Sequence, residues 1–182
     1  MILGSDKGGL VAIAQIEYVG RTTRLMVRKE LNITTIEQLR GKKIAVLGLA
    51  FKPGTDDVRQ APSIDVIRQL VDFGARVNAY DPIAGPNGEQ LVPQITLCTD
   101  PYECVRGVDA VLVVTEWPEF AALDWGRIAD LVRRRLVVDG RNLLDEGLLA
   151  SLGFTYLRVG RRPPKNARRR RAIAPLASPA VG

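Results

Sequence analysis

The chain has 182 residues, of which 46% are hydrophobic and 25% are charged, a composition that is typical of globular domains and excludes disordered and fibrous classes for the body of the chain. This length allows one α/β domain with extensions at its ends. The formal net charge of +6 would suit a nucleic-acid-binding protein if the positive charge covered the whole surface.

The first 40 residues contain mixed signals, and we expect helical or irregular structure there. Thr35-Ile36-Glu37-Gln38 has the spacing of a capping box, and Met26 to Leu31 also fits a helix. The apolar stretch from Leu10 to Ile16 is far shorter than the ~20 residues of a membrane helix. No cationic segment precedes this stretch, as one would in a secretory signal. We therefore expect a cytoplasmic protein without membrane contacts.

A regular alternation of strand and helix patterns begins at Lys43. The apolar run from Ile44 to Leu49 suits a strand that is buried on both faces of a parallel sheet. Apolar residues at helical spacing from Pro62 to Val71 predict a helix that begins with proline and ends at Gly74 in a left-handed conformation. Arg76 to Tyr80 is the next predicted strand.

The remaining elements continue this alternation after a Gly/Pro-containing loop. Strands are predicted at 94–98, 110–114, 136–138 and 154–157, and helices at 100–105, capped by Asp100, at 128–132 and at 143–149. Such an alternation implies right-handed βαβ crossovers. We therefore expect an α/β fold over residues 41–160: a Rossmann-like, doubly wound parallel sheet in three α/β/α layers, with strand order 3-2-1-4-5-6.

The loop after the first strand of this domain, Gly48 to Ala61, is where a ligand site is expected. In doubly wound sheets, ligands bind beyond the carboxyl ends of the strands, at the point where the strand order reverses. The loop does not have the Gly-x-Gly-x-x-Gly turn that brings a pyrophosphate onto a helix N-terminus. A standard NAD site is therefore not expected in this domain.

Several side chains of the loop suit nucleotide recognition. Phe51 can stack on or pack against a base, and Lys52 is a mobile cation for phosphate or polar base edges. Arg59 has a planar fork that can bind phosphate or carboxylate. Asp56 and Asp57 could be catalytic carboxylates, but beside two cations we expect ion-pair and capping partners that hold the loop. An ordinary surface loop rich in turn-forming residues is the alternative.

The two cysteines, Cys98 and Cys104, are too few for a disulfide framework, and the chain contains no histidine. Without histidine, the common metal sites and Cys/His nucleophile pairs are excluded. We expect both cysteines to be small apolar packing residues and expect neither a metal site nor a catalytic residue in this chain.

The segment from Gly48 to Arg59, followed by Ala61-Pro62-Ser63, resembles the signature of the UDP-glucose/GDP-mannose dehydrogenase family. The segments Ala79 to Pro82, Thr115 to Phe120 and Val138 to Asn142 resemble the same domain in the same order, so that the resemblance covers about residues 41–158. The Thr-Asp-Asp, Ala-Pro-Ser and Thr-Glu-Trp spellings are more similar to the UDP-glucose enzymes than to the GDP-mannose enzymes.

The resemblance implies the UDP-binding C-terminal domain of an enzyme with an NAD-binding domain and a central helical dimerisation region. Phe51 and Lys52 match residues that contact the UDP-sugar, Arg141 matches an arginine at the nucleotide, and Arg59 matches one that reaches NAD. In the family, a cysteine and a lysine oxidise the sugar C6 alcohol to a carboxylate in two steps, with NAD as hydride acceptor. The Gly-rich segment that contains this cysteine in the family is not in this sequence. We therefore expect that the chain is inactive alone.

The resemblance also implies the partners of the chain. These are UDP-glucose or a related UDP-sugar, and either the missing dehydrogenase domains or further copies of the chain. A non-catalytic nucleotide-binding or interaction module is the alternative function.

The basic character belongs to the last part of the chain. Seven Lys and Arg residues lie between 161 and 171, and without them 19 cations face 20 acids. Four prolines make regular structure unexpected in 161–182, so we expect a solvated, disordered tail. Contact of this tail with nucleic acid, anionic lipid or an acidic partner is the less favoured alternative. Residues 1–40 and the tail depart from the family pattern. A truncated or rearranged reading frame would produce both departures.

Overall fold

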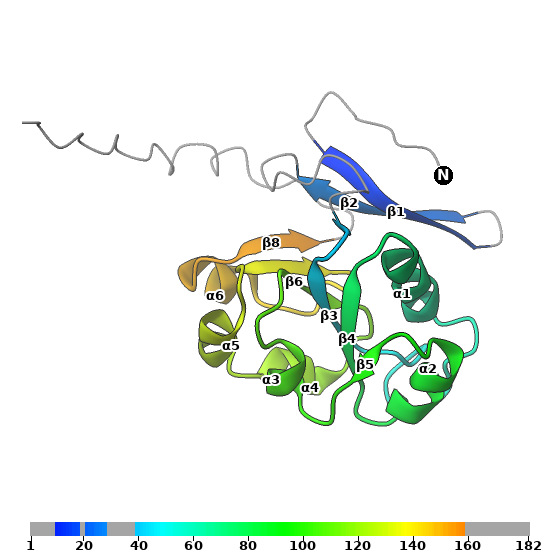
Figure 1. Ribbon diagram of the computed structural model, residues 1–182. Coiled ribbons are helices and arrows are strands. Elements are labelled where there is room, and N and C mark those ends of the chain that lie inside the picture. Colours follow the sequence, from blue (N-terminus) through cyan, green and yellow to red (C-terminus); the bar gives the residue numbers. More distant parts are fainter. Residues whose placement is uncertain (1–9, 19–20, 29–38, 159–182) are drawn as a thin grey trace, which may run out of the picture.

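The computed structural model describes residues 10–18, 21–28 and 39–158 (Figure 1). A six-stranded sheet flanked by helices forms the main body, and a separate two-stranded hairpin lies beside it. The capping-box prediction at 35–38 and the disorder prediction for the tail, 161–182, fall outside the described residues.

The six strands of the main sheet are all paired in parallel. They are β3 (Lys43–Leu47), β4 (Arg76–Tyr80), β5 (Thr96–Leu97), β6 (Ala110–Val113), β7 (Leu136–Asp139) and β8 (Thr155–Arg158). Their order across the sheet is β5-β4-β3-β6-β7-β8. Counted within this sheet, the order is 3-2-1-4-5-6, so the predicted topology is confirmed.

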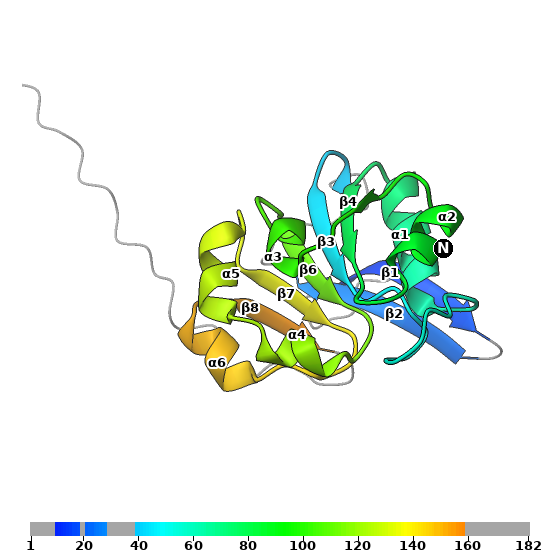
Figure 2. The same cartoon turned by 90° about the horizontal axis from the view of Figure 1, so that it is seen from below.

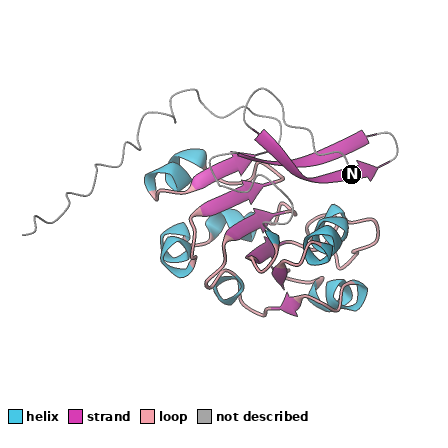
Figure 3. Ribbon diagram, turned by 45° about the horizontal axis from the view of Figure 1, so that its top comes forward, coloured by secondary structure: helices cyan, strands magenta, loops and turns pink. Residues whose placement is uncertain are grey.

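Helices cover both faces of the sheet (Figures 2 and 3). They are α1 (Pro62–Asp72), α2 (Gly85–Leu91), α3 (Pro101–Cys104), α4 (Pro118–Ala122), α5 (Trp125–Leu131) and α6 (Glu146–Ser151). Successive residues of a strand point to opposite faces. Ile44 and Val46 therefore pack in the core beneath α1, whereas Ala45 and Leu47 pack with α3 to α6. The three-layer α/β/α prediction is confirmed.

Local signals in the sequence set the ends of several helices. Pro62 is the first residue of α1, where its missing N–H costs no hydrogen bond. Gly74 has φ +82° and follows this helix, and the Ala75 N–H returns to the Leu70 carbonyl. The Asp100 carboxylate caps α3 by accepting the Glu103 N–H at 3.0 Å, as predicted.

Several predictions within the domain differ from the structure: α4 was not predicted, and α5 begins at Trp125 instead of residue 128. The Gly/Pro-containing segment 85–91 is the helix α2, not a loop; Gly88 lies so close to Leu49 that a Cβ atom would be 2.7 Å from the leucine Cδ1. Small residues that lower helix propensity thus allow this close packing. Helix α6 begins at Glu146 instead of residue 143, because the Leu143 and Leu144 N–H groups donate to the Asp139 carboxylate.

The helical prediction for the first part of the chain is also wrong where the structure describes it. Strands β1 (Leu10–Tyr18) and β2 (Arg21–Arg28) pair in antiparallel fashion, with a register shift between Ala12 and Ala14. Both strands are rich in the β-branched residues Val, Ile and Thr, which favour extended backbone. The boundary at residue 40 stays a prediction. In the described parts of the chain, no helix has the length and apolarity needed to cross a membrane.

Candidate functional site

Four loops meet at the edge of the sheet where the parallel strands have their carboxyl ends. The loop after β3 comprises residues 48–61 and is called the β3 loop below. The loops after β4, β6 and β7 begin at Asp81, Val114 and Gly140. Because β3 pairs with both β4 and β6, the β3 loop lies between two of the other loops, where the strand order reverses.

Gly48 determines how the β3 loop leaves its strand. Its φ is +95°, a conformation that glycine adopts without steric cost. Its N–H donates to the Tyr80 carbonyl at 2.8 Å, and an added Cβ would lie 2.5 Å from the Thr115 Cβ. The chain can therefore pass between β4 and the β6 loop only with glycine at this position.

The Asp81 carboxylate accepts hydrogen bonds from five donors at this edge. It is only 7% exposed, and its two oxygens accept N–H groups from three loops. The donors are the backbone of Leu49 (2.7 Å), Ala50 (3.0 Å), Ile83 (3.0 Å) and Ala84 (2.7 Å), and the indole of Trp117 (3.1 Å). Charge-assisted bonds of this kind offset the cost of burying a carboxylate.

Two buried hydroxyl groups bind the carbonyls of the same two loop residues. Ser63 Oγ donates to the Leu49 oxygen at 2.5 Å, and Thr115 Oγ1 donates to the Ala50 oxygen at 2.6 Å. Leu49 and Ala50 lie beyond the last paired residue of β3, Leu47. Side chains thus replace the sheet ladder as hydrogen-bond partners of this backbone.

The predicted nucleotide contacts follow directly after this fixed backbone. The Phe51 side chain is 51% exposed, and Lys52 is exposed as well. The Phe51 N–H donates to the Asp57 carbonyl at 2.9 Å, which closes the turn that contains Lys52. The structure therefore presents an aromatic ring and a cation from a short, closed turn.

Asp57 and Arg59 form the ion pair that was predicted for this loop. The two Asp57 oxygens accept Arg59 Nε and Nη2, each at 2.9 Å. This pairing holds the pKa of the Asp57 carboxyl at about 2, below its usual 3.8. Asp56 binds the Asn87 side chain of α2 through its carbonyl at 3.0 Å. Asp57 thus holds the loop through an ion pair, as predicted, whereas the Asp56 carboxylate accepts the neutral Asn87 amide at 3.3 Å.

Arg141 lies in the loop after β7, and a second buried carboxylate fixes its backbone. Asp139 is fully buried, and its Oδ1 accepts the Arg141 N–H at 2.9 Å. The other oxygen accepts the Tyr156 hydroxyl at 2.8 Å. Burial, followed by this bond to Asp139, raises the pKa of Tyr156 well above its ordinary value.

The Arg141 side chain binds Glu116 of the β6 loop, with Nε as donor. This bond lowers the pKa of the Glu116 carboxyl. Glu116 follows Thr115, whose hydroxyl binds Ala50. A continuous series of contacts therefore connects Arg141 with the β3 loop that contains Phe51 and Lys52.

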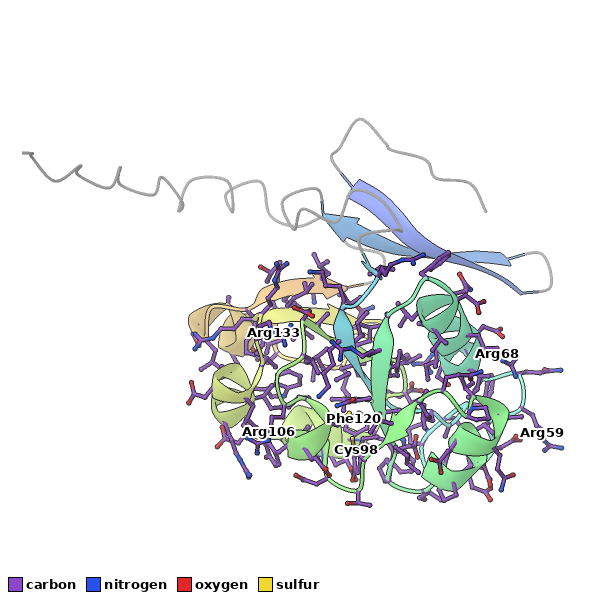
Figure 4. All side chains as sticks on the ribbon, viewed as in Figure 1. Arg59, Arg68, Cys98, Arg106, Phe120 and Arg133 are labelled. Atoms are coloured by element: carbon purple, nitrogen blue, oxygen red, sulfur yellow. The ribbon has the colours of Figure 1, made fainter. Side chains whose placement is uncertain are left out.

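The first turn of α1 does not provide the helix-terminus site at which Rossmann folds bind the pyrophosphate of a dinucleotide. Helix α1 begins only after the whole β3 loop, its first residue Pro62 has no N–H, and Asp65 places an acid in its first turn. Rossmann dinucleotide sites bind the pyrophosphate through backbone N–H donors at a helix terminus, where negative charge is unfavourable. Arg59 points outward from the side of α1 and α2 (Figure 4), and its side chain is 86% exposed.

Cys98 and Cys104 are buried in the core face formed with α3 to α6, so the prediction that they are packing residues is confirmed. Figure 4 shows Cys98 near Phe120, inside the body of the domain. Neither thiol lies on the four loops of the candidate site. No group of three His, Cys, Asp or Glu side chains within the described ranges is arranged to hold a metal ion.

Four residues that build this edge had no predicted role: Asp81, Thr115, Glu116 and Asp139. All four lie in the segments that carry the family resemblance. The available signal was their position, because each comes one or two residues after the end of a predicted strand. The carboxyl ends of parallel strands meet at one edge, so polar residues there are candidates for a common network.

The model of the UDP-glucose/GDP-mannose dehydrogenase family, UDP binding domain, matches residues 45–146. The UDP-glucose 6-dehydrogenase of Rhizobium meliloti (strain 1021) is 46% identical over 123 residues, which are 68% of this chain and 28% of that protein. Residues 45–146 include most of the main sheet and the loops at its carboxyl edge.

Two archaeal structures share the fold. The UDP-D-ManNAc dehydrogenase of Pyrococcus horikoshii has a TM-score of 0.54 and 30% identity over 66% of this chain and 26% of its own. The UDP-glucose dehydrogenase of Pyrobaculum islandicum has a TM-score of 0.51 and 36% identity over 63% of this chain and 27% of its own. The chain spans less than a third of the length of these three relatives. It belongs to the UDP-glucose/GDP-mannose dehydrogenase family, and residues 45–146 are the UDP binding domain of that family.

Proposed function

We propose that this chain binds the nucleotide part of a UDP-sugar, as the substrate-binding domain of a UDP-glucose 6-dehydrogenase. One observation carries this proposal: the β3 loop has a backbone fixed by buried side chains and then exposes Phe51 and Lys52. A site that is ordered before its ligand arrives loses less conformational entropy on binding. The identity to UDP-glucose 6-dehydrogenases supports UDP-glucose as the sugar nucleotide.

Each proposed contact has its own chemistry. The Phe51 ring packs against the base, and its 51% exposure leaves apolar surface for that contact. The Lys52 ammonium binds a phosphate or a polar base edge. Arg141 binds the nucleotide from the β7 loop, with its Nε held by Glu116. An aromatic group and two cations suit a flat base that is linked to a diphosphate.

We also propose that oxidation takes place only in an assembly that contains further domains or further copies of this chain. NAD would act there as hydride acceptor, bound outside the β3 loop, and Arg59 would reach toward it. The side chain of Arg59 is 86% exposed, which supports such a contact. We propose a cytoplasmic location, where the two cysteines would stay reduced.

Isothermal titration calorimetry with UDP, UDP-glucose and GDP tests the binding proposal. UDP and UDP-glucose should bind more tightly than GDP. Lys52→Ala and Arg141→Ala should each weaken UDP binding by about 1–3 kcal/mol, the value of one charge-assisted contact. The absence of binding at millimolar UDP would overturn the proposal for the chain as it stands.

Arg133→Ala is the matched control for these variants. Arg133 is 59% exposed and binds the Asp109 carboxylate at 3.4 Å, at the amino edge of the sheet and far from the four loops (Figure 4). Its substitution removes the same charge and should leave the affinity for UDP unchanged. An equal loss in Arg133→Ala and Arg141→Ala would show that net charge, and not a site, determines binding.

A further inference from the structure

We infer that Asp81 is a positioning residue for the nucleotide site: its carboxylate fixes the Leu49-Ala50 backbone and thereby the direction of Phe51 and Lys52. The expected effect of Asp81 on affinity rests on the proposed function. The expected effect of Asp81 on the order of the loop does not rest on it, because that order can be measured without a ligand.

The two oxygens of Asp81 divide their donors between different loops. Oδ2 accepts the Leu49 and Ala50 N–H groups of the β3 loop and the Trp117 indole of the β6 loop. Oδ1 accepts the Ile83 and Ala84 N–H groups of its own β4 loop. One buried carboxylate therefore connects three loops that meet at this edge.

The backbone immediately before Phe51 has defined partners on both sides. Asp81 binds the N–H groups of Leu49 and Ala50, and the hydroxyls of Ser63 and Thr115 bind their carbonyls. The pairing of β3 with β4 and β6 ends at Leu47, so the sheet itself does not order these residues. Without the carboxylate, the two N–H groups would lose their acceptor and this backbone could turn.

An asparagine at position 81 cannot replace the carboxylate, although it has the same size. Its amide has one oxygen and one NH₂ group. If the NH₂ group faces Ile83 and Ala84, these two donors lose their acceptor; if it is turned the other way, Leu49, Ala50 and Trp117 lose theirs. Asp81→Asn thus removes at least two acceptor contacts while it leaves the packing volume nearly unchanged.

Nuclear magnetic resonance of the nitrogen-15-labelled chain measures the state of the loop. The two tryptophans provide a probe and an internal reference, since the Trp117 indole donates to Asp81 and the Trp125 indole donates to the Phe120 carbonyl in the core. In Asp81→Asn, the Trp117 indole signal should move and the Leu49 and Ala50 amides should exchange about tenfold faster or more, since in either orientation of the new amide their bonds to the carboxylate are lost or become weaker bonds to a neutral oxygen.

Calorimetry on the same variant should show an affinity for UDP that is reduced about tenfold or more. Asp109→Asn is the matched control, because Asp109 is also buried, at 6% exposure, and accepts the Lys43 N–H at 3.0 Å at the opposite edge of the sheet. This control should lower stability without a change in loop exchange or in affinity.

The outcomes separate the inference from the proposed function. Faster exchange with unchanged UDP affinity would overturn positioning while binding stands. If the wild-type chain binds no UDP, the proposed function fails, and exchange at Leu49 and Ala50 that matches the Asp109→Asn control would overturn the inference as well.

Should Asp81→Asn fail to fold, the wild-type chain still provides a test. Ala50 and Trp117 donate to the same oxygen of Asp81, so saturation with UDP should move the Trp117 indole signal and leave the Trp125 signal in place. Binding that moves neither indole would refute the role of Asp81.

Discussion

Substitution of Gly48 by alanine tests the geometry of the carboxyl edge most directly. The residue has φ +95°, and the new methyl group would lie 2.5 Å from the Thr115 Cβ and 2.7 Å from the Thr115 backbone nitrogen. A backbone atom at that distance cannot be relieved by a side-chain rotation. Thr115 is also held by its own bond to the Ala50 carbonyl, so either the β3 loop or the β6 loop must shift.

The expected cost has two parts. A non-glycine residue in a left-handed conformation costs roughly 1–2 kcal/mol, and an extra methyl group in a closely packed region costs about 1–3 kcal/mol. Gly48→Ala should therefore lower the free energy of unfolding by about 2–5 kcal/mol, a large part of the ~5–15 kcal/mol of a typical domain. At ~4 °C per kcal/mol for a domain of this size, Tm should fall by roughly 8–20 °C.

Thermal and urea unfolding followed by circular dichroism measure this loss. Gly54→Ala is the control, because Gly54 also has a left-handed φ, +76°, but a Cβ there would have no atom within 4 Å. The control should show only the conformational cost of about 1–2 kcal/mol. Equal losses in the two variants would refute the contact with Thr115 as the reason for glycine at position 48.

Two further predictions concern the β3 loop and its anchors. Ser63→Ala leaves a buried loop carbonyl without its donor and should lower the free energy of unfolding in urea by about 1–3 kcal/mol. The control is Ser151→Ala, because the hydroxyl bond of Ser151 is exposed, and it should cost less than about 0.5 kcal/mol. Similar costs in the two variants would contradict this prediction. Pairing with Arg59 lowers the pKa of Asp57 from 3.8 to about 2, so its stabilising contribution is present above pH 3.8 and is lost as the pH falls toward 2. The urea midpoint of the wild type should therefore fall more steeply in that range than that of Asp57→Asn, and Asp65→Asn should follow the wild type; parallel curves for all three would show that the pair has no effect.

The sheet could be predicted because its determinants are local in the sequence. The apolar run that forms β3 is buried on both faces, as parallel strands require, and helical patterns were predicted between most of the strands. Pro62, Gly74 and Asp100 indicated the ends of α1 and α3 through conformations that each residue type favours. From these signals, right-handed connections leave few possible strand orders.

Elements that depend on distant contacts could not be predicted in the same way. The residues of α2 favour turns, and the helix forms because Gly88 can lie against Leu49 of the β3 loop. The resemblance indicated Phe51, Lys52 and Arg141, but it did not show how the chain holds them. Asp81 binds partners 32 and 36 positions away in the sequence, Leu49 and Trp117. Such a network is specified only after the sheet has brought the strand ends together.

The two cysteines provide a means to study the motions of the protein. Cys98 and Cys104 are 6% and 0% exposed, and the chain has no other cysteine. A thiol reagent can reach them only when β5 and α3 separate from the rest of the domain. The rate of modification therefore measures how often that opening occurs. A single cysteine introduced on the β3 loop would react far faster than either. A fluorescent label could therefore be attached there without removal of the native thiols.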